Sequence, residues 1–140
     1  MSRADAARSP RLLLTVATVV ATVATAGSLF FSLGLGLTPC RLCWYQRILM
    51  YPLVVVLGVA AVEERPAVAR TVLPLSVFGL GLAAYHSWLQ VTQTTCSVGV
   101  VSCATVQYRL FGLLTIPNLS LLAFSLVTGG VAACWWQARE

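Results

Sequence analysis

Two closely spaced cysteine pairs are the residues of this sequence whose type and spacing could do chemistry. Cys40 and Cys43 form a CxxC motif, and Cys96 and Cys103 follow with six residues between them. Such pairs cycle between thiol and disulfide, close structural loops or bind zinc, depending on the compartment and the neighbouring residues. Taken alone, the second pair favours a loop-closing disulfide.

The first pair opens a predicted helix, and this position favours redox chemistry. The helix dipole and a nearby arginine stabilise thiolate, the species that attacks disulfides. A disulfide between Cys40 and Cys43 would be readily reduced, and so small a loop would add little stability. Haem attachment requires CxxCH and is excluded because residue 44 is Trp44. A structural disulfide and a zinc site remain as alternatives, although zinc would need a second matching pair.

The helices that must position these cysteines are expected to cross a membrane. Of the 140 residues, 59% are hydrophobic and 9% are charged, whereas a soluble domain carries about 25% charged residues. The nine basic residues are all arginines spread along the chain, so they form no nucleic-acid patch. We therefore expect one domain over residues 1–140 whose surroundings are the lipid bilayer, with no nucleic acid as partner.

Long uncharged stretches predict an all-α fold, a four-helix transmembrane bundle with two outer loops that each carry a cysteine pair. A short inner turn at 63–70 joins its two helical hairpins. A signal peptide cleaved after Ala26 is an alternative for the first span, but the apolar run continues to Leu37 and favours an uncleaved helix. The expected spans are 12–35, 44–62, 71–91 and 111–135.

Arginine placement predicts the orientation, because cytoplasmic loops carry an excess of basic residues. One side of the predicted bundle holds Arg3, Arg8, Arg11, Arg65, Arg70 and Arg139. The other side holds Arg41, Arg47 and Arg109. Both termini are therefore expected in the cytoplasm and both cysteine loops on the outer face. Aromatic residues at the helix ends fit interfacial belts: Trp44, Tyr45, Trp88, Trp135 and Trp136.

Arg47 is predicted to lie inside the outer edge of the membrane. Only fifteen uncharged residues separate it from Glu63, which gives about 22 Å of helix at ~1.5 Å per residue. This length is too short for a hydrocarbon core of ~30 Å, so the second helix must include Arg47. Cys40, Cys43 and Arg47 are spaced i, i+3 and i+7 along one helix face. A cation at this depth is expected to stabilise a thiolate or a bound anion.

Other polar residues of the spans have less specific roles. His86, near the outer end of the third span, is expected either to bond a neighbouring helix or to handle protons or a ligand. Arg109 is expected to open the fourth helix as an interface anchor. Pro117 and Asn118 are expected to kink that helix. Cys134, at the cytoplasmic end, is expected to be an inert thiol.

With these features the chain resembles the DsbB family of disulfide-bond formation proteins, and most closely its short-looped BdbC-like branch. The four spans occur in the order of that family. Four stretches carry the likeness: 39–52 (PCRLCWYQRILMYP), 85–90 (YHSWLQ), the Cys96 to Cys103 segment and 111–122 (FGLLTIPNLSLL).

The resemblance implies an enzyme of the bacterial cytoplasmic (inner) membrane. Such proteins reoxidise a thioredoxin-fold thiol oxidase, DsbA-like or BdbD-like, and pass the electrons to a membrane quinone, either ubiquinone or menaquinone. By position, the partner would attack Cys96, Cys103 would exchange with Cys40, and Cys43 would reduce the quinone. No metal is expected. The six-residue spacing of the second pair is shorter than in long-looped members and is shared with the BdbC-like branch.

The same resemblance assigns the two polar candidates to the quinone site. Arg47 matches the family's quinone-side arginine, and His86 matches a histidine linked to that site. A quinone reductase of the vitamin K epoxide reductase kind is disfavoured, because there the CxxC motif comes late in the chain. A non-enzymatic protein braced by disulfides does not explain Arg47 beside a CxxC motif.

Overall fold

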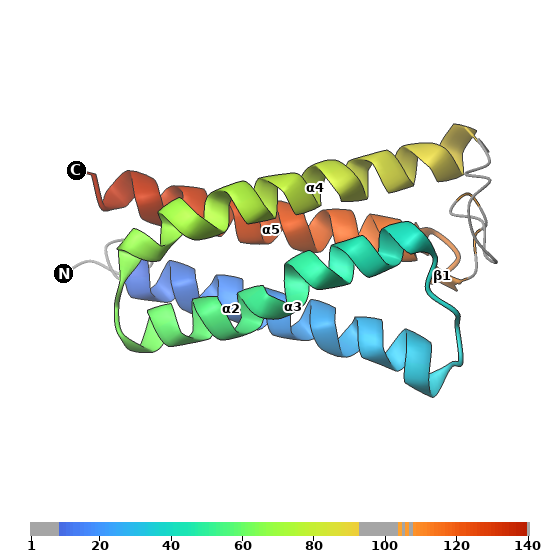
Figure 1. Cartoon of the computed structure of the whole chain (residues 1–140), viewed down its shortest axis with the longest axis horizontal. Helices are drawn as coiled ribbons and strands as arrows, with labels where there is room; N and C mark the ends of the chain where they lie inside the picture. The colour runs from blue at the N-terminus through green and yellow to red at the C-terminus, as the bar shows by residue number, and fades with distance from the viewer. Residues whose placement is uncertain (1–8, 93–103, 105, 107, 140) are drawn as a thin grey trace.

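The structure is a computed structural model that describes residues 9–92, 104, 106 and 108–139. Four helices in these residues are long and apolar enough to cross a membrane, which confirms the predicted fold class. They form an antiparallel bundle in which α2 begins and α5 ends at the same end (Figure 1). The elements are α2 (Pro10–Leu29), the π-helix η1 (Phe30–Gly34), α3 (Arg41–Val62), the 3-10 helix η2 (Pro66–Val68), α4 (Ala69–Thr92), β1 (Arg109–Leu110), β2 (Leu114–Thr115) and α5 (Ile116–Gln137).

The first three predicted spans agree with the observed helices to within one helical turn when η1 is counted as the continuation of α2. Ser9 caps α2, since its hydroxyl accepts a hydrogen bond from the Leu12 amide at 3.3 Å, and Pro10 occupies the first turn. Pro52 in α3 and Pro74 in α4 each remove one backbone hydrogen bond within the helix. These two helices, and not the fourth, contain an interior proline.

The predicted start of the fourth span at Phe111 is wrong. Arg109 lies in β1 opposite Thr115 of β2, so it does not open a helix. Phe111 and Gly112 turn the hairpin with φ of 53° and 73°, values that a right-handed helix does not contain. The uncharged run that follows Arg109 did not indicate the strand or the turn, because apolar composition alone does not distinguish a hairpin from a buried helix.

The predicted kink at Pro117 and Asn118 is also wrong. Helix α5 begins at Ile116, with Thr115 as its N-cap, so Pro117 lies in the first turn. The amide that proline lacks would have no partner within the helix at this position. Pro117 therefore marks the start of the helix and leaves its axis uninterrupted.

The core lies between helices that pack in a ring. Each long helix packs against the next one in the sequence, and α2 also packs against α5. The outer surface carries many large apolar side chains, as a lipid-facing surface requires. Along α2 the hydroxyls of Thr15, Thr18 and Thr22 donate to backbone carbonyls four residues earlier. These hydroxyls are therefore satisfied without water.

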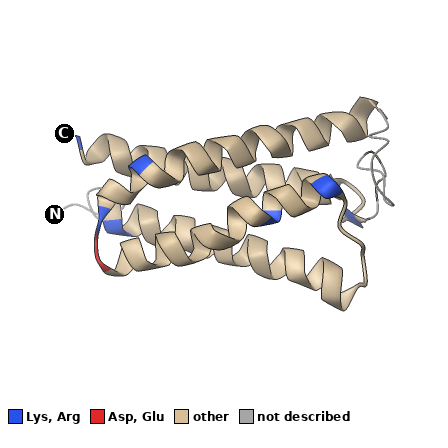
Figure 2. Cartoon of the chain, viewed as in Figure 1, with Lys and Arg blue, Asp and Glu red and all other residues tan. Residues whose placement is uncertain are grey.

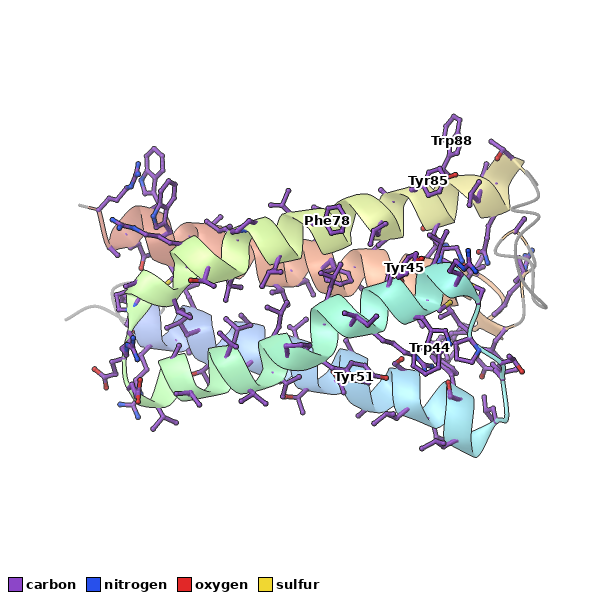
Figure 3. The ribbon with its side chains drawn as sticks, in the orientation of Figure 1. Trp44, Tyr45, Tyr51, Phe78, Tyr85 and Trp88 are labelled. Atoms are coloured by element: carbon purple, nitrogen blue, oxygen red, sulfur yellow. The ribbon has the colours of Figure 1, made fainter. Side chains whose placement is uncertain are left out.

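Charged side chains lie mainly near the ends of the bundle, and a group of aromatic side chains lies near the end where α3 begins. Figure 2 shows charge at the two ends of the bundle and a short distance into α3. At the end where α2 begins, two exposed ion pairs join Arg11 to Glu64 at 2.8 Å and Arg65 to Glu63 at 2.9 Å. At the other end, the aromatic residues near the start of α3 and the end of α4 gather as an interfacial belt would: Trp44, Tyr45, Tyr85 and Trp88 (Figure 3).

Gly79 permits the close packing of α4 on α5, and this makes a stability prediction. A Cβ at Gly79 would lie 2.1 Å from the ring of Phe124, which is fully buried. Overpacking of this kind costs about 1–3 kcal/mol, so Gly79→Ala is expected to lower the Tm of the detergent-solubilised protein. Gly81 on the same helix is the matched control, because a Cβ there meets nothing within 4 Å. Equal Tm values for the two alanine variants would contradict this packing.

Candidate functional site

The CxxC motif lies where the chain enters α3, at the end of the bundle opposite to Cys134. Cys40 is the N-cap residue, with extended backbone angles (φ −73°, ψ 172°), and Cys43 lies in the first turn. Their sulfur atoms are 3.1 Å apart, and both are present as thiols. Cys40 is buried, whereas Cys43 is partly exposed. The two sulfurs are thus close together but differ in access.

His86 brings α4 to the same sulfur pair. Its Nε2 atom is 3.6 Å from the Cys40 sulfur, and its Nδ1 atom is 3.2 Å from the amide nitrogen of Gln46. Both His86 and Gln46 are buried. When the amide nitrogen donates to Nδ1, the ring proton is on Nε2, directed at Cys40. His86 therefore bonds to the neighbouring helix α3, which is one of its two expected roles. It also contacts the sulfur of Cys40, at the N-cap of that helix.

The Cys40 thiol is held in its neutral form. Its hydrogen bond with Cys43 is the largest cause, followed by burial, and together they raise the pKa of Cys40 to about 12 despite the opposing contact with His86. The expectation that the helix start ionises this motif is therefore not met at Cys40 in the reduced pair. A neutral, buried sulfur is poorly suited to attack a disulfide, although as part of a disulfide it can still be attacked.

Arg47 lies in the second turn of α3, so it belongs to the second helix as predicted, and it is anchored to the first helical segment. Its Nη2 atom donates to the Ser28 carbonyl at 3.0 Å and to the Ser32 hydroxyl. The Tyr51 hydroxyl donates to the Ser28 hydroxyl at 3.1 Å, and the guanidinium lies 5.4 Å from the centre of the Trp44 ring. These partners offset the cost of placing a cation in a helix that can span a membrane.

An apolar cavity of about 490 Å³ lies beside Cys43 and Arg47. It is bordered by α2, α3 and α5, and several of its lining residues, such as Val23 and Leu126, are also exposed on the outer surface. The cavity is therefore reached from the lipid side of the bundle. Few polar side chains line it: Ser28, Cys43, Gln46, Arg47, Tyr51 and Ser120.

The structure brings four of the six candidate residues together: Cys40, Cys43, Arg47 and His86. Cys43 and Arg47 border the cavity, whereas His86 lies on the α4 side of Cys40 and, among the described residues, is not part of the cavity lining. Cys96 and Cys103 lie outside the described residues. Cys134 is buried near the start of α2, with its sulfur 3.9 Å from the Pro10 carbonyl, away from the CxxC motif.

Sequence reasoning missed three residues that support the site. The Gln46 amide contacts His86, and the Ser28 carbonyl and the Ser32 hydroxyl accept hydrogen bonds from Arg47. Gln46 could have been found, because a glutamine inside a predicted membrane helix needs a polar partner. The serines gave no such signal, since a serine hydroxyl is readily satisfied within its own helix.

The fold and this site define a membrane-embedded dithiol protein, and comparison with known proteins shows its family. The family model described as "Disulfide bond formation protein DsbB" matches residues 10–135. No solved structure shows a significant match. The chain therefore belongs to the DsbB family of disulfide bond formation proteins, which confirms the resemblance and a general role as a disulfide oxidoreductase.

Curated relatives cover most of the chain. The "Probable disulfide formation protein C 2" of Bacillus cereus is 41% identical over 118 residues, which are 81% of this chain and 84% of the relative. The "Disulfide bond formation protein C" of Bacillus subtilis is 42% identical over 114 residues, or 78% and 82%. The "Probable disulfide formation protein" of Deinococcus radiodurans is 42% identical over 132 residues, or 86% and 85%.

Proposed function

We propose that this protein is a quinone-dependent disulfide-generating enzyme. It takes electrons from a reduced thioredoxin-fold thiol oxidase, DsbA-like or BdbD-like, and passes them to the quinone pool of the membrane. The observation that carries this proposal is the shared cavity: a thiol, Cys43, and a cation, Arg47, border one apolar space that opens to lipid.

The cavity fits the head of a membrane quinone. Its volume of about 490 Å³ lies within the range of ~300–1,000 Å³ that small-molecule pockets occupy. Its walls are largely apolar, and the opening at Val23 and Leu126 leads to the lipid that would hold an isoprenoid tail. Arg47 would bind a ring oxygen, and Cys43 would lie at the ring. A quinone, ubiquinone or menaquinone, supplies an acceptor for two electrons and two protons.

The cysteines act in a relay whose electrons balance. A partner thiolate attacks Cys96 of the Cys96–Cys103 disulfide, and Cys103 leaves as a thiolate. Cys103 then attacks Cys40, the Cys40–Cys43 bond breaks, and Cys43 leaves as the thiolate beside the cavity. The second partner thiol then releases Cys96, and Cys96 attacks Cys103, so that the Cys96–Cys103 disulfide forms again and Cys40 leaves as a thiol. The two electrons then reside on the Cys40–Cys43 dithiol, and their transfer with two protons to a quinone would restore the second disulfide.

His86 and Gln46 act on Cys40 in this proposal. The contact of Nε2 with the Cys40 sulfur supports a role in holding or moving a proton at that atom. With its amide nitrogen facing Nδ1, Gln46 favours the form of the ring whose proton is on Nε2. His86 would thus serve the quinone site through the CxxC pair.

The proposed location is the bacterial cytoplasmic membrane, with the CxxC motif on the outer face. The described arginines favour this orientation by four to three, since Arg11, Arg65, Arg70 and Arg139 lie at the end where α2 begins and α5 ends, and Arg41, Arg47 and Arg109 lie toward the other end. Excess arginine marks the cytoplasmic side. The partner oxidase would therefore meet the protein outside the cytoplasm, where exported proteins acquire disulfides.

The deciding experiment supplies the purified protein with a reduced thioredoxin-fold dithiol oxidase and a soluble quinone. We expect one quinone to be reduced for each partner disulfide formed. Ubiquinone and menaquinone analogues are compared in parallel to determine the quinone type. Absence of turnover with every quinone, with a folded protein and a competent partner, would favour a membrane scaffold braced by disulfides.

A further inference from the structure

We propose that the reduced Cys40–Cys43 pair and His86 form a binding site for a thiophilic divalent cation such as Zn²⁺. Occupation of this site would hold the pair as thiolates and stop disulfide generation. The binding stands on geometry alone, whereas the inhibition rests on the proposed function. Zinc would then act as a regulator of the site and take no part in the reaction.

The three ligand atoms are already close enough for one ion. The two sulfurs and a ring nitrogen of His86 all lie within 4.8 Å of one another. Tetrahedral zinc with Zn–S of ~2.3 Å and Zn–N of ~2.0 Å places two sulfurs about 3.8 Å apart and sulfur and nitrogen about 3.5 Å apart. The observed sulfur–nitrogen distance of Cys40 and His86 is 3.6 Å, and the sulfurs are 3.1 Å apart. A small rotation of one thiol side chain would complete the geometry.

From the sequence, a zinc site at Cys40 and Cys43 lacked further ligands, because no second cysteine pair matches the first. The structure supplies the missing ligand from another helix, because His86 of α4 is 46 residues from Cys40 in the chain. Three protein ligands and an open fourth position are a common arrangement in zinc sites that retain a water. Cys43 is partly exposed in the first turn of α3, so the fourth position can remain open to a water.

Charge and hydrogen bonding also suit the ion. Two thiolates and a divalent cation sum to zero charge, so the occupied site avoids a net charge among buried groups. A metal-bound imidazole needs an acceptor for its other N–H group. If Nε2 of His86 binds the metal, Nδ1 carries the proton, and the side-chain oxygen of Gln46 can accept it after a half-turn of the amide. Gln46 can therefore serve both the metal-free and the metal-bound ring.

Metal binding and disulfide formation exclude each other at this pair. Binding converts two thiols and one divalent cation into a dithiolate complex and releases two protons, with no transfer of electrons. The Cys40–Cys43 disulfide offers no thiolate to a metal. The ion would therefore bind only the reduced protein and would delay its reoxidation.

Titration of the reduced protein with Co²⁺, as a coloured substitute for Zn²⁺, tests the binding. A Cys96→Ser, Cys103→Ser, Cys134→Ser variant leaves Cys40 and Cys43 as its thiols, and His86 is the one histidine of the chain. We expect one Co²⁺ per chain with a thiolate-to-cobalt absorption band that Zn²⁺ abolishes. The oxidised variant is expected to show no band.

Two substitutions separate this site from nonspecific binding. His86→Gln keeps a polar side chain that can bond to Gln46 and removes the nitrogen ligand, so we expect affinity to fall at least about tenfold. Gln46→Leu removes the partner of the ring and is expected to weaken binding about 10–100-fold. Far-UV circular dichroism checks that both variants remain folded. Unchanged cobalt affinity in His86→Gln, or equal binding to the oxidised protein, would overturn the proposal.

The inhibition is measured separately as the effect of Zn²⁺ on quinone reduction. We expect Zn²⁺ to slow turnover and a chelator to restore it, with His86→Gln less sensitive than the protein with His86. Cobalt binding without any quinone turnover would leave the metal site standing and remove the proposed function. Quinone turnover without cobalt binding would support the proposed function and remove the metal site.

Discussion

Replacement of Cys43 by serine is expected to abolish quinone reduction while the bundle stays folded. In the proposed relay every electron pair leaves the chain through this sulfur, and a serine hydroxyl carries out no thiol–disulfide exchange. Cys43 is also the cysteine of the motif that borders the cavity. The loss should therefore be complete, down to the uncatalysed rate, and it is measured as quinone consumed with a reduced partner present.

Cys40→Ser provides a second test of the motif, and Cys134→Ser is the control for loss of a cysteine outside it. Cys40→Ser should abolish turnover as well, because no disulfide can then form within the motif. Cys134→Ser should leave turnover unchanged, because Cys134 is buried at the opposite end of the bundle. Retained activity in both Cys40→Ser and Cys43→Ser would remove the CxxC pair from the mechanism, whatever the family of the chain.

The helices were largely predictable because a membrane imposes simple requirements on them. A span needs a long uncharged run, and three such runs end near charged residues or a turn at about the observed bounds. The start of α5 was not predictable in this way, because the uncharged run continues through the hairpin at Phe111 and Gly112. Thr115 and Pro117 were the local signals of the true helix start.

The site was predictable where its residues are close in sequence. The position of the CxxC motif at the start of α3 and the inclusion of Arg47 in that helix follow from the length and charge of one helix. The contacts of Cys40 with His86, and of Arg47 with Ser28, join different helices. Such contacts depend on how the helices rotate and pack against each other, which the hydropathy of a single sequence does not determine.

The π-helix illustrates this limit. Residues Phe30–Gly34 continue α2 with a wider turn, and Ser28 and Ser32, which hold Arg47, lie before and within it. Wider turns of this kind frequently occur at functional sites. Nothing in the apolar composition of the first span indicates where the turn widens. The hydrogen bonds that hold Arg47 could therefore not be predicted from the sequence and were found only in the packed bundle.

Replacement of Arg47 by alanine is expected to raise the KM for quinone at least about tenfold, with a smaller change in the KM for the partner dithiol. The bonds to Ser28 of α2 and Ser32 of η1 use one terminal nitrogen, Nη2. A guanidinium has five N–H donors, so others can address a quinone oxygen at the cavity. A hydrogen bond to a charged group contributes about 1.5–3 kcal/mol, which corresponds to roughly tenfold or more in affinity. The measurement is initial rates over a range of quinone concentrations at saturating partner.

Arg41→Ala is the matched control, because Arg41 also lies on α3 but is exposed in its first turn. It changes the net charge by the same amount and, among the described residues, Arg41 is not part of the cavity lining. A rise in the quinone KM for Arg47→Ala alone would therefore report a contact at the cavity and not a change in long-range attraction. If both variants, or neither, altered the quinone dependence, Arg47 would be an anchor between α3 and α2, and the quinone would have to be held by the apolar walls and Cys43.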